Sequence, residues 1–161
     1  MKTDPQHPNV HDMMAGPLAG LPLPDFLNLP DYELGFWQAA QREELRIQQC
    51  SQCGLFRHLP SPMCHSCHSF NYRWTEVSGR GRVYSFVIVH HPVHTALKAG
   101  LQIPYNLCLI ELREQANLRL LSNVLDIDNE DIKINMDVRV CFKRVPATPD
   151  LILPFFIRDE V

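Results

Sequence analysis

Apolar and polar positions follow two different periods along the chain, a helical one first and a period of two after it. Apolar residues recur at helical spacing behind Asp31, at Tyr32, Phe36, Trp37 and Ala40. Polar side chains fill the positions between them, as on the solvent face of an amphipathic helix. Because Asp is a common N-cap residue, the pattern predicts a helix over residues 32–43 capped by Asp31.

The following residues alternate with the period of a strand. Leu45 and Ile47 are apolar, whereas Arg46 and Gln48 between and after them are polar. Successive side chains of a strand point to opposite faces, so this alternation predicts a strand leading into the cysteine at position 50.

Short β-like runs fill the chain from Glu76 onward. They are VYSFVIV (83–89), PYNLCLIEL (104–112), NLRLLSNV (117–124), DVRVCFKRV (137–145) and LILPFFI (151–157). The Asp- and Asn-rich segment 126–136 is suited to a turn and predicts at most one helical turn. Five short strands with one longer connection fit a small Greek-key barrel of the OB type, and an open five-stranded sheet accounts for the same pattern.

Prolines dominate the first 30 residues, which hold six of the thirteen in the chain. Fixed φ angles and missing N–H donors exclude a continuous helix or an inner strand there. Two interpretations remain open for this arm. It is either a disordered tail or a segment that wraps a partner, and Phe26, Leu27 and Leu29 near its end favour the second.

Composition places the chain among globular proteins. It has 161 residues, of which 45% are hydrophobic, and a net charge of −3, which fits one or two soluble units. Apolar runs reach only about seven residues, too few for a membrane-spanning helix. The first residues lack the basic and apolar regions of a secretory signal, so we expect a cytoplasmic protein.

Four of the six cysteines form the pattern C-x2-C, ten residues, C-x2-C. They are Cys50, Cys53, Cys64 and Cys67. Each pair lets two thiolates from one tight turn reach the same ion, and two facing turns complete a tetrahedral four-sulfur site. Gly54 and His68 follow the two pairs, where a positive φ is often required. The spacing therefore predicts one structural zinc, whose four protein ligands leave no position for a substrate.

Other interpretations of the cysteines are weaker. A redox-active C-x-x-C usually accompanies a βαβ unit, which the pattern does not contain. Residues 64–68 also match the C-x-x-C-H of haem attachment, but that would leave the first cysteine pair without a purpose. His58, His65 or His68 remains as a possible replacement for one thiolate.

Two further segments carry candidate chemistry. His90, His91 and His94 flank Pro92, which disfavours the helix that zinc-binding histidines use, so a polar loop is the better interpretation. The segment 78–82, SGRGR, could bind a phosphate through backbone amides and the guanidinium groups of Arg80 and Arg82, or it is a bend into the barrel. Both interpretations of this segment stay open.

The two remaining cysteines lie in predicted strands. Cys108 is expected to fill the core, because its strand is apolar on both faces. Cys141 alternates with Arg139 and Lys143, so it is expected to point away from the barrel interior, where it is exposed or covered by a partner.

The order of these parts resembles a known family. The residues that carry the resemblance are Phe36 and Trp37, ELRIQQCSQCG (44–54), MCHSC (63–67), WTEVSGRGRVYSFVIVHHPVH (74–94), IPYNLCLIEL (103–112) and the segment 119–142. Together they resemble a zinc-ribbon plus OB-fold family, long catalogued as a domain of unknown function, that is associated with acyl-CoA enzymes. The resemblance runs from about residue 31 to the C-terminus.

This resemblance implies a mainly β chain with a short N-terminal helix, a rubredoxin-like zinc ribbon and a five-stranded OB-type barrel. The corresponding boundaries are 1–30 for the arm, 31–49 for the helix and first ribbon strand, 50–75 for the zinc ribbon and 76–161 for the barrel. Two features depart from the family pattern: His68 replaces a glycine, and the proline-rich arm has no counterpart.

The resemblance also implies a function. Family members are typically non-catalytic partners of thiolase-fold enzymes, including thiolases, acyltransferases and sterol side-chain aldolases, or of hydratases, and hold the CoA part of a thioester. Charge and stacking suggest Arg80, Arg82, Phe36, Trp37 and Tyr84 as CoA contacts, although each aromatic is equally explained as core.

Two other functions compete with this one. A single-stranded nucleic-acid binder is possible because zinc ribbons and OB barrels often serve that purpose. Residues 76–161 contain ten Lys or Arg and eleven Asp or Glu, a balance that gives no basic groove. A free-standing enzyme is the third possibility, but no complete catalytic motif is recognisable in the sequence.

Overall fold

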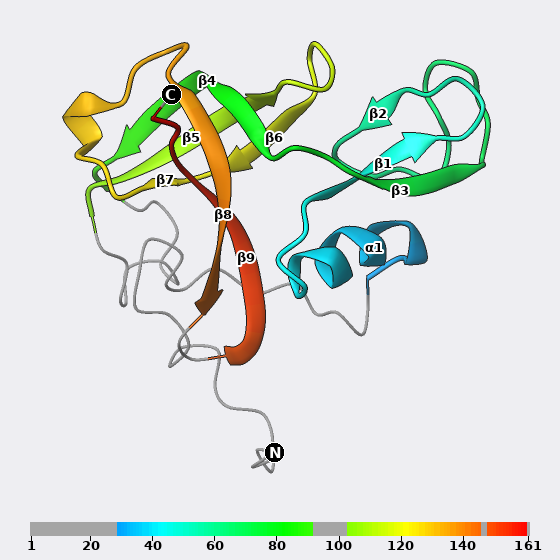
Figure 1. The fold of residues 1–161 in the computed structure, drawn as a ribbon, viewed down its shortest axis with the longest axis horizontal. Helices are drawn as coiled ribbons and strands as arrows, with labels where there is room; N and C mark the ends of the chain where they lie inside the picture. Colours follow the sequence, from blue (N-terminus) through cyan, green and yellow to red (C-terminus); the bar gives the residue numbers. More distant parts are fainter. Residues whose placement is uncertain (1–28, 92–102, 146–147, 161) are drawn as a thin grey trace.

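The computed structural model describes residues 29–91, 103–145 and 148–160. In chain order its elements are α1 (Asp31–Ala40), β1 (Arg46–Cys50), β2 (Phe56–Arg57), β3 (Tyr72–Glu76), β4 (Arg80–Val89), β5 (Tyr105–Leu112), β6 (Arg119–Ser122), β7 (Val124–Leu125), the 3₁₀ turn η3 (Asn129–Asp131), β8 (Asp137–Val145) and β9 (Thr148–Arg158). Figure 1 shows the small sheet β1–β3 on one side, the large sheet β4–β9 on the other and α1 beneath the small sheet. Residues 1–28 of the predicted arm, and His94, lie outside the described residues.

Helix α1 confirms the helical pattern but differs from it at both ends. The cap position is Pro30, which makes no side-chain hydrogen bond, and Asp31 is the first helical residue. There its carboxylate lies near the positive end of the helix dipole. The helix ends at Ala40, before the predicted residue 43, because Glu43 adopts a φ of 58° in a left-handed turn. Among the described residues, no helix is both long and apolar enough to cross a membrane.

The small sheet has the order β2-β1-β3, and all its pairs are antiparallel. Strand β1 confirms the strand predicted before Cys50, but its burial does not alternate strictly, because Gln48 is fully buried beside Ile47. Gly35 of α1 lies directly against the indole ring of Trp74 on β3, so a side chain at position 35 would collide with it. A glycine in this helix therefore allows its close approach to the ribbon.

The large sheet has six strands in the order β6-β5-β4-β8-β9-β7. All five predicted runs form strands, and the third is divided into β6 and β7. The hydrogen-bonded sheet is open, in agreement with the open sheet left as an alternative to the OB-type barrel, and it has six strands instead of five. Its two edge strands are nevertheless consecutive in the chain, separated only by Asn123. The two edges are thus joined by the chain itself, through one strand that bends to pair first with β5 and then with β9.

Buried asparagines stabilise this bend. The Asn106 side chain accepts a hydrogen bond from the N–H of Val124 at 2.8 Å and donates to the carbonyl of the same residue at 2.9 Å. The Asn123 side chain donates in turn to the backbone carbonyl of Asn106. Because the ladder is interrupted here, these amides satisfy backbone groups that would otherwise be buried without partners.

Strand β9 is buried on both faces, which explains its continuous apolar run. Phe156 belongs to the main core with Val83, Ile110 and Val138. On the other face, a second cluster contains Leu151, Leu153 and Phe155, against which Trp37 and Cys141 pack. Cys108 is fully buried, as predicted. Cys141 points away from the main core, also as predicted, but residues of this same chain cover part of it.

Two glutamine side chains fasten the first part of the chain to the large sheet. Gln41, just after α1, bonds both the N–H and the carbonyl of Ile152 at 3.0 and 3.2 Å. Gln115, after β5, does the same to Phe56 of β2 at 2.9 and 3.1 Å. Each amide thus replaces a missing strand partner, and together they fix helix and ribbon against the barrel.

Candidate metal centre and apolar cavity

The two cysteine turns have the same backbone geometry. In the first, Cys50 N–H donates to Leu55 and Gly54 N–H donates to Cys50, at 2.9 and 3.0 Å. In the second, Cys64 N–H donates to Ser69 and His68 N–H donates to Cys64, both at 2.9 Å. The residues after each pair have positive φ angles, 78° at Gly54 and 58° at His68. This confirms the expected role of both residues and shows that His68 completes the turn in place of a glycine.

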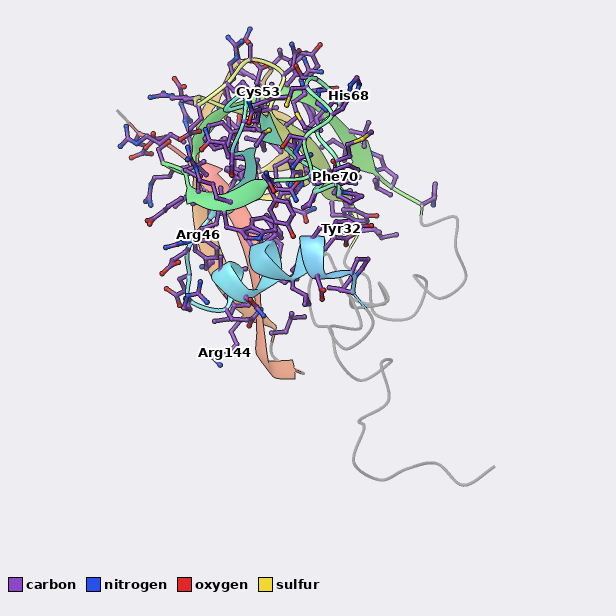
Figure 2. All side chains as sticks on the ribbon, turned by 90° about the vertical axis from the view of Figure 1, so that its right-hand side faces the viewer. Tyr32, Arg46, Cys53, His68, Phe70 and Arg144 are labelled. Atoms are coloured by element: carbon purple, nitrogen blue, oxygen red, sulfur yellow. The ribbon has the colours of Figure 1, made fainter. Side chains whose placement is uncertain are left out.

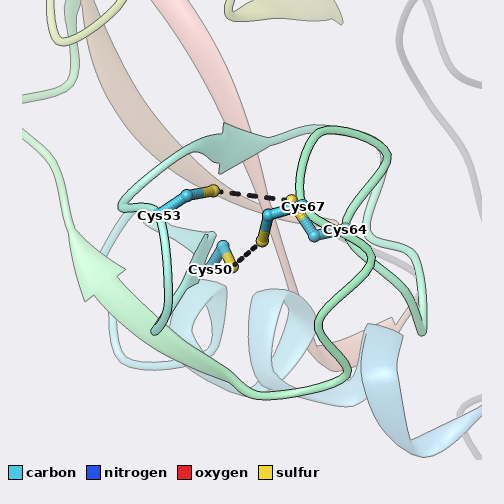
Figure 3. Close-up of side chains that lie close together, drawn as sticks. All are labelled: Cys50, Cys53, Cys64 and Cys67. Atoms are coloured by element: carbon cyan, nitrogen blue, oxygen red, sulfur yellow. Dashed lines mark hydrogen bonds between the residues drawn. The ribbon is translucent and has the colours of Figure 1, made fainter.

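The four thiol groups converge on one point. Figure 3 shows Cys50 opposite Cys67 and Cys53 opposite Cys64, with Sγ–Sγ distances of 3.5 and 3.7 Å. All four sulfur atoms lie within 4.8 Å of one another. Tetrahedral zinc with bonds near 2.3 Å requires sulfur separations of about 3.8 Å, so the arrangement fits the ion. The geometry matches a closed, four-sulfur structural site.

Backbone amides prepare two of the four sulfur atoms, those of Cys50 and Cys64, for a cation. The N–H groups of Cys53 and Gln52 donate to the Cys50 sulfur and lower its pKa to about 6. The N–H groups of Cys67 and Ser66 likewise lower the pKa of Cys64. Donors that favour the thiolate also favour metal binding, because the thiolate is the form that coordinates zinc.

The histidines considered as alternative ligands lie outside this cluster. Among the described residues, the four cysteines alone form a group with converging metal-binding atoms. His58 packs against Phe36, with ring centroids 5.2 Å apart and ring planes tilted by 45°, and burial lowers the pKa of His58 to about 4. His65 and His68 are exposed in the second turn. Figure 2 shows Cys53 and His68 together at the end of the ribbon, away from the α1 residue Tyr32. His90 and His91 lie in the bend that ends β4, in keeping with a polar loop.

A mainly apolar cavity of about 320 Å³ lies where helix, ribbon and barrel meet. Its wall comes from α1, the loop after β2, and strands β5, β6 and β9. The lining residues are Glu33, Phe36, Trp37, His58, Leu59, Pro60, Leu107, Leu120, Leu121, Ser122, Asn123, Leu153, Pro154 and Phe155. Leu59 and Leu121 are 79% and 60% exposed, so the cavity continues into an apolar surface. Exposed apolar groups around such a hollow are typical of a ligand or partner site.

Two of the five residues suggested as CoA contacts line this cavity. Phe36 is almost fully buried and belongs to the core, whereas Trp37 is partly buried beside it. Tyr84 lies elsewhere on β4, where the guanidinium carbon of Arg119 is 3.5 Å from its ring centroid. The structure therefore brings the first two together and separates Tyr84 from them.

Arg80 and Arg82 form the start of β4, and each has an acidic partner. Arg82 donates to Glu111 at 2.7 Å, and this bond lowers the pKa of that carboxyl. Arg80 lies 3.6 Å from Asp159. Arg82 lines a different cavity, of about 540 Å³, together with Glu111 and Asp137. The segment is thus a strand that begins after a turn at Gly79, with φ of 69°, and its suggested contact with phosphate stays a prediction.

Sequence reasoning missed most of the apolar cavity. Leu59, Leu107, Leu121 and Phe155 come from segments far apart in the chain, and each has the ordinary appearance of a strand or loop residue. A weak signal existed at Leu121, which lies next to Leu120 and so must leave the core face if Leu120 enters it. The position of α1 decides which outward-facing residues line the same cavity. The sequence pattern does not contain the position of this helix relative to the strands.

Comparison with protein families finds two adjacent matches. Residues 37–73 match the family described as the rubredoxin-like zinc ribbon domain of ChsH2. Residues 74–143 match the C-terminal OB-fold domain of ChsH2.

Curated relatives include two enzyme subunits and a scaffold. The chain is 39% identical over 122 residues to a probable enoyl-CoA hydratase alpha subunit of Thermomonospora curvata, covering 75% of this chain and 36% of that protein. It is 33% identical over 111 residues to the 3-oxo-4,17-pregnadiene-20-carboxyl-CoA hydratase alpha subunit of Mycobacterium tuberculosis, covering 69% and 33%. It therefore spans about a third of the length of these two relatives. A DUF35 domain-containing scaffold protein of Methanocaldococcus jannaschii is 30% identical over 103 residues, 63% of this chain and 70% of that protein.

A solved structure is similar over most of the chain. It is described as the Ltp2-ChsH2(DUF35) aldolase and has a TM-score of 0.71 and 35% sequence identity. The match covers 81% of this chain and 97% of that one.

Proposed function

The chain belongs to the ChsH2 family of proteins that join a rubredoxin-like zinc ribbon to an OB-fold domain, and from this membership we propose that it is an accessory, CoA-thioester-binding subunit. It binds part of an acyl-CoA and holds it for a catalytic partner. The partner is a subunit of the thiolase fold, or an aldolase, in a hetero-oligomer. The chain itself supplies binding and no chemical step.

The observation that carries this proposal is the apolar cavity between helix, ribbon and barrel. A volume of about 320 Å³ lies at the small end of ligand pockets, so the cavity takes a segment of an acyl-CoA and not the whole molecule. Leu107, Leu121 and Phe155 provide apolar contact to an acyl or pantetheine chain. Glu33 and Asn123 are polar groups at the same wall and orient the amides of that chain.

Each part of the chain has a role in this arrangement. When zinc is bound, it holds the two turns together and thereby fixes the ribbon from which Leu59 reaches the cavity wall. Trp37 contributes an aromatic face at the opposite wall. Arg80 and Arg82 provide half-exposed positive charge on the barrel, which suits the phosphates of CoA after exchange with their present acidic partners.

The proposal of a catalytic partner draws on the relatives. Two of them are named as alpha subunits of CoA-thioester hydratases, one with a steroid substrate, and the solved relative is named as an aldolase together with Ltp2. Four thiolate ligands fill a tetrahedral zinc shell, so a zinc ion there has no open position for a substrate carbonyl. Steroid or related lipid degradation is the metabolic setting that fits these names.

Calorimetric titration of the zinc-loaded chain with CoA and with a long-chain acyl-CoA tests the binding. We expect tighter binding of the acyl form, because apolar surface enters the cavity. The same protein is titrated with single-stranded DNA at several salt concentrations. Binding of DNA that falls steeply with salt, with no response to CoA, would indicate the nucleic-acid function instead.

Copurification from the native host tests the partnership. We expect a CoA-dependent lyase, hydratase or acyltransferase subunit to be recovered with the full chain. Deleting residues 1–30, the predicted arm, should weaken recovery while zinc stays bound, since all four ligands lie beyond them. Turnover of an acyl-CoA by the purified chain alone would contradict the accessory role.

A further inference from the structure

Arg57 on β2 is an arginine buried in the ribbon, with only 3% of its surface exposed. Its Nη1 atom donates a long hydrogen bond of 3.3 Å to the Ser61 hydroxyl. Its Nε and Nη2 atoms are buried and have no partner among the described residues. Gln48, directly across the strand pair, is fully buried as well, and its Nε2 atom also lacks a partner.

The unpartnered atoms of Arg57 belong to one edge of the guanidinium group. Nε and Nη2 form the side edge that binds two oxygen atoms of a carboxylate or phosphate at once. Arg82 uses these same two atoms on Glu111, at 3.2 and 2.7 Å, although its side chain is 55% exposed. Arg57 therefore combines the stronger need for a counter-charge with the absence of an acidic partner, and an uncompensated buried charge is destabilising.

A cavity of about 310 Å³ lies beside Arg57, between the ribbon and the loop after β5. Its wall contains the polar residues Arg57, His58, Ser61, His65, Gln115 and Asn117 together with five apolar residues, and no acidic side chain lines it. This local excess of positive charge contrasts with the net charge of −3 of the whole chain. Arg57 is the charged hydrogen-bond donor in the wall of this cavity. The side-chain amides of Gln115 and Asn117 line the same wall.

A zinc-loaded cysteine cluster is a negative group within the ribbon, because the charge of four thiolates exceeds that of one zinc ion. The unpartnered Nε and Nη2 atoms make no hydrogen bond to any cysteine sulfur. The side edge of Arg57 is thus not used on the cluster, and it needs an acceptor of its own.

We propose that this ribbon–barrel cavity is a binding site for a phosphate-type oxyanion, with Arg57 as the charged donor. The guanidinium group turns from its long bond with Ser61 toward the cavity, and its side edge then takes two oxygen atoms of the anion. The phosphate belongs either to free inorganic phosphate or to a phosphate group of CoA. The site stands independently of the proposed CoA function, because the first source needs no thioester.

Thermal unfolding of the zinc-loaded full chain tests the site, with inorganic phosphate titrated against chloride at constant ionic strength. We expect the unfolding midpoint of the wild type to rise with phosphate, because a ligand that binds only the folded state stabilises it. Arg57→Met should lose this response. Arg73→Gln is the matched control, since Arg73 is an exposed arginine of the same ribbon that uses Nε and Nη2 on Gln49, and it should keep the response.

Arg57→Lys guards against a variant that fails to fold. It keeps the charge but loses the two-point edge, so calorimetry should give phosphate binding weakened by about tenfold. No phosphate response in the wild type, or an equal response in Arg57→Met, would overturn the proposal. A third outcome would also overturn the proposal: Arg57→Met loses zinc, and phosphate does not stabilise the wild type. Arg57 would then serve as the counter-charge of the metal cluster.

The source of the phosphate is decided by comparing CoA with dephospho-CoA in the wild type and in Arg57→Lys. The site takes the 3′-phosphate of CoA if two results hold. Removing this phosphate and changing Arg57 to Lys each weaken CoA binding by the same factor, and the two changes together weaken it no further. If CoA binding ignores the substitution while inorganic phosphate does not, the site takes free phosphate.

Discussion

The metal centre and the apolar cavity are built in opposite ways. The four zinc ligands lie within 18 consecutive positions, 50–67, and two short turns of equal geometry present them. The cavity wall draws on residues from Glu33 to Phe155, and the helix, the loop after β2 and strands of the large sheet contribute. A local turn determines the first site, whereas only the complete fold produces the second.

This difference makes the two sites vulnerable to different changes. Loss of one ligand should remove the metal centre without disturbing the barrel, because the main barrel core of Val83, Ile110 and Phe156 does not involve the thiolates. Damage to the barrel should spoil the cavity before it affects the metal. Loss of the metal is therefore expected to spare the large sheet while loosening the part of the cavity wall that the ribbon supplies at His58, Leu59 and Pro60.

The largest effect is expected from Cys64→Ser. Replacing one thiolate should release zinc and melt residues 45–75, with a loss on the order of 10 kcal/mol of ribbon stability, as for structural zinc sites. Metal analysis and backbone NMR spectra check this result. Cys141→Ser is the control, because Cys141 lies outside the cluster. Retained zinc in Cys64→Ser, or native iron or haem in place of zinc, would contradict the assignment.

A core change in the barrel should have the next largest effect. Phe156 is fully buried, so Phe156→Ala should reduce barrel stability by about 3–5 kcal/mol through the cavity it leaves. Denaturant unfolding followed by fluorescence and by zinc release checks whether the metal outlasts the barrel. Ile134→Ala, at a side chain 61% exposed, should change stability little. Release of zinc at the same denaturant concentration as barrel unfolding would show that the two regions are coupled.

A charge at the cavity rim should affect binding and spare the fold. Leu121 is 60% exposed and lines the cavity, so Leu121→Glu should weaken acyl-CoA binding by roughly 2 kcal/mol, since a carboxylate would have to be desolvated by the acyl chain. Ile134→Glu provides a control of equal exposure, 61%, away from this cavity. Equal acyl-CoA affinity in both variants, measured by calorimetry, would place the ligand elsewhere.

The smallest effect is expected from the double variant Arg80→Ala, Arg82→Ala. Their side chains are 51% and 55% exposed, so solvent screening limits the lost CoA affinity to about 0.5 kcal/mol per arginine. Arg42→Ala removes an equally exposed arginine, also 55%, at the helix end and serves as the control. Unchanged CoA titration in the double variant would refute these phosphate contacts and leave the cavity proposal intact.

The sequence by itself determined the metal centre and the order of the elements. Two C-x2-C turns need only local backbone geometry, so the residue types at positions 54 and 68, a glycine and a histidine that tolerate positive φ, already indicate where each turn ends. Strand alternation likewise identified β1 and β8, because a period of two records burial on one face. Short β-like runs identified β4, β5 and β9, and the last two are apolar on both faces. Cys108 as core filler followed from the same reasoning.

The tertiary structure decided how the large sheet bends at Asn123 and where the cavity lies. The bend at Asn123 depends on Asn106, 17 positions earlier, and Gln41 reaches Ile152 across 111 positions. The tertiary structure also pairs Arg82 with Glu111, and it leaves the buried Nε and Nη2 atoms of Arg57 without a partner among the described residues. Periodicity reports whether a side chain is buried, but not against which distant segment. Contacts of this kind arise only when the helix, the ribbon and the barrel pack together.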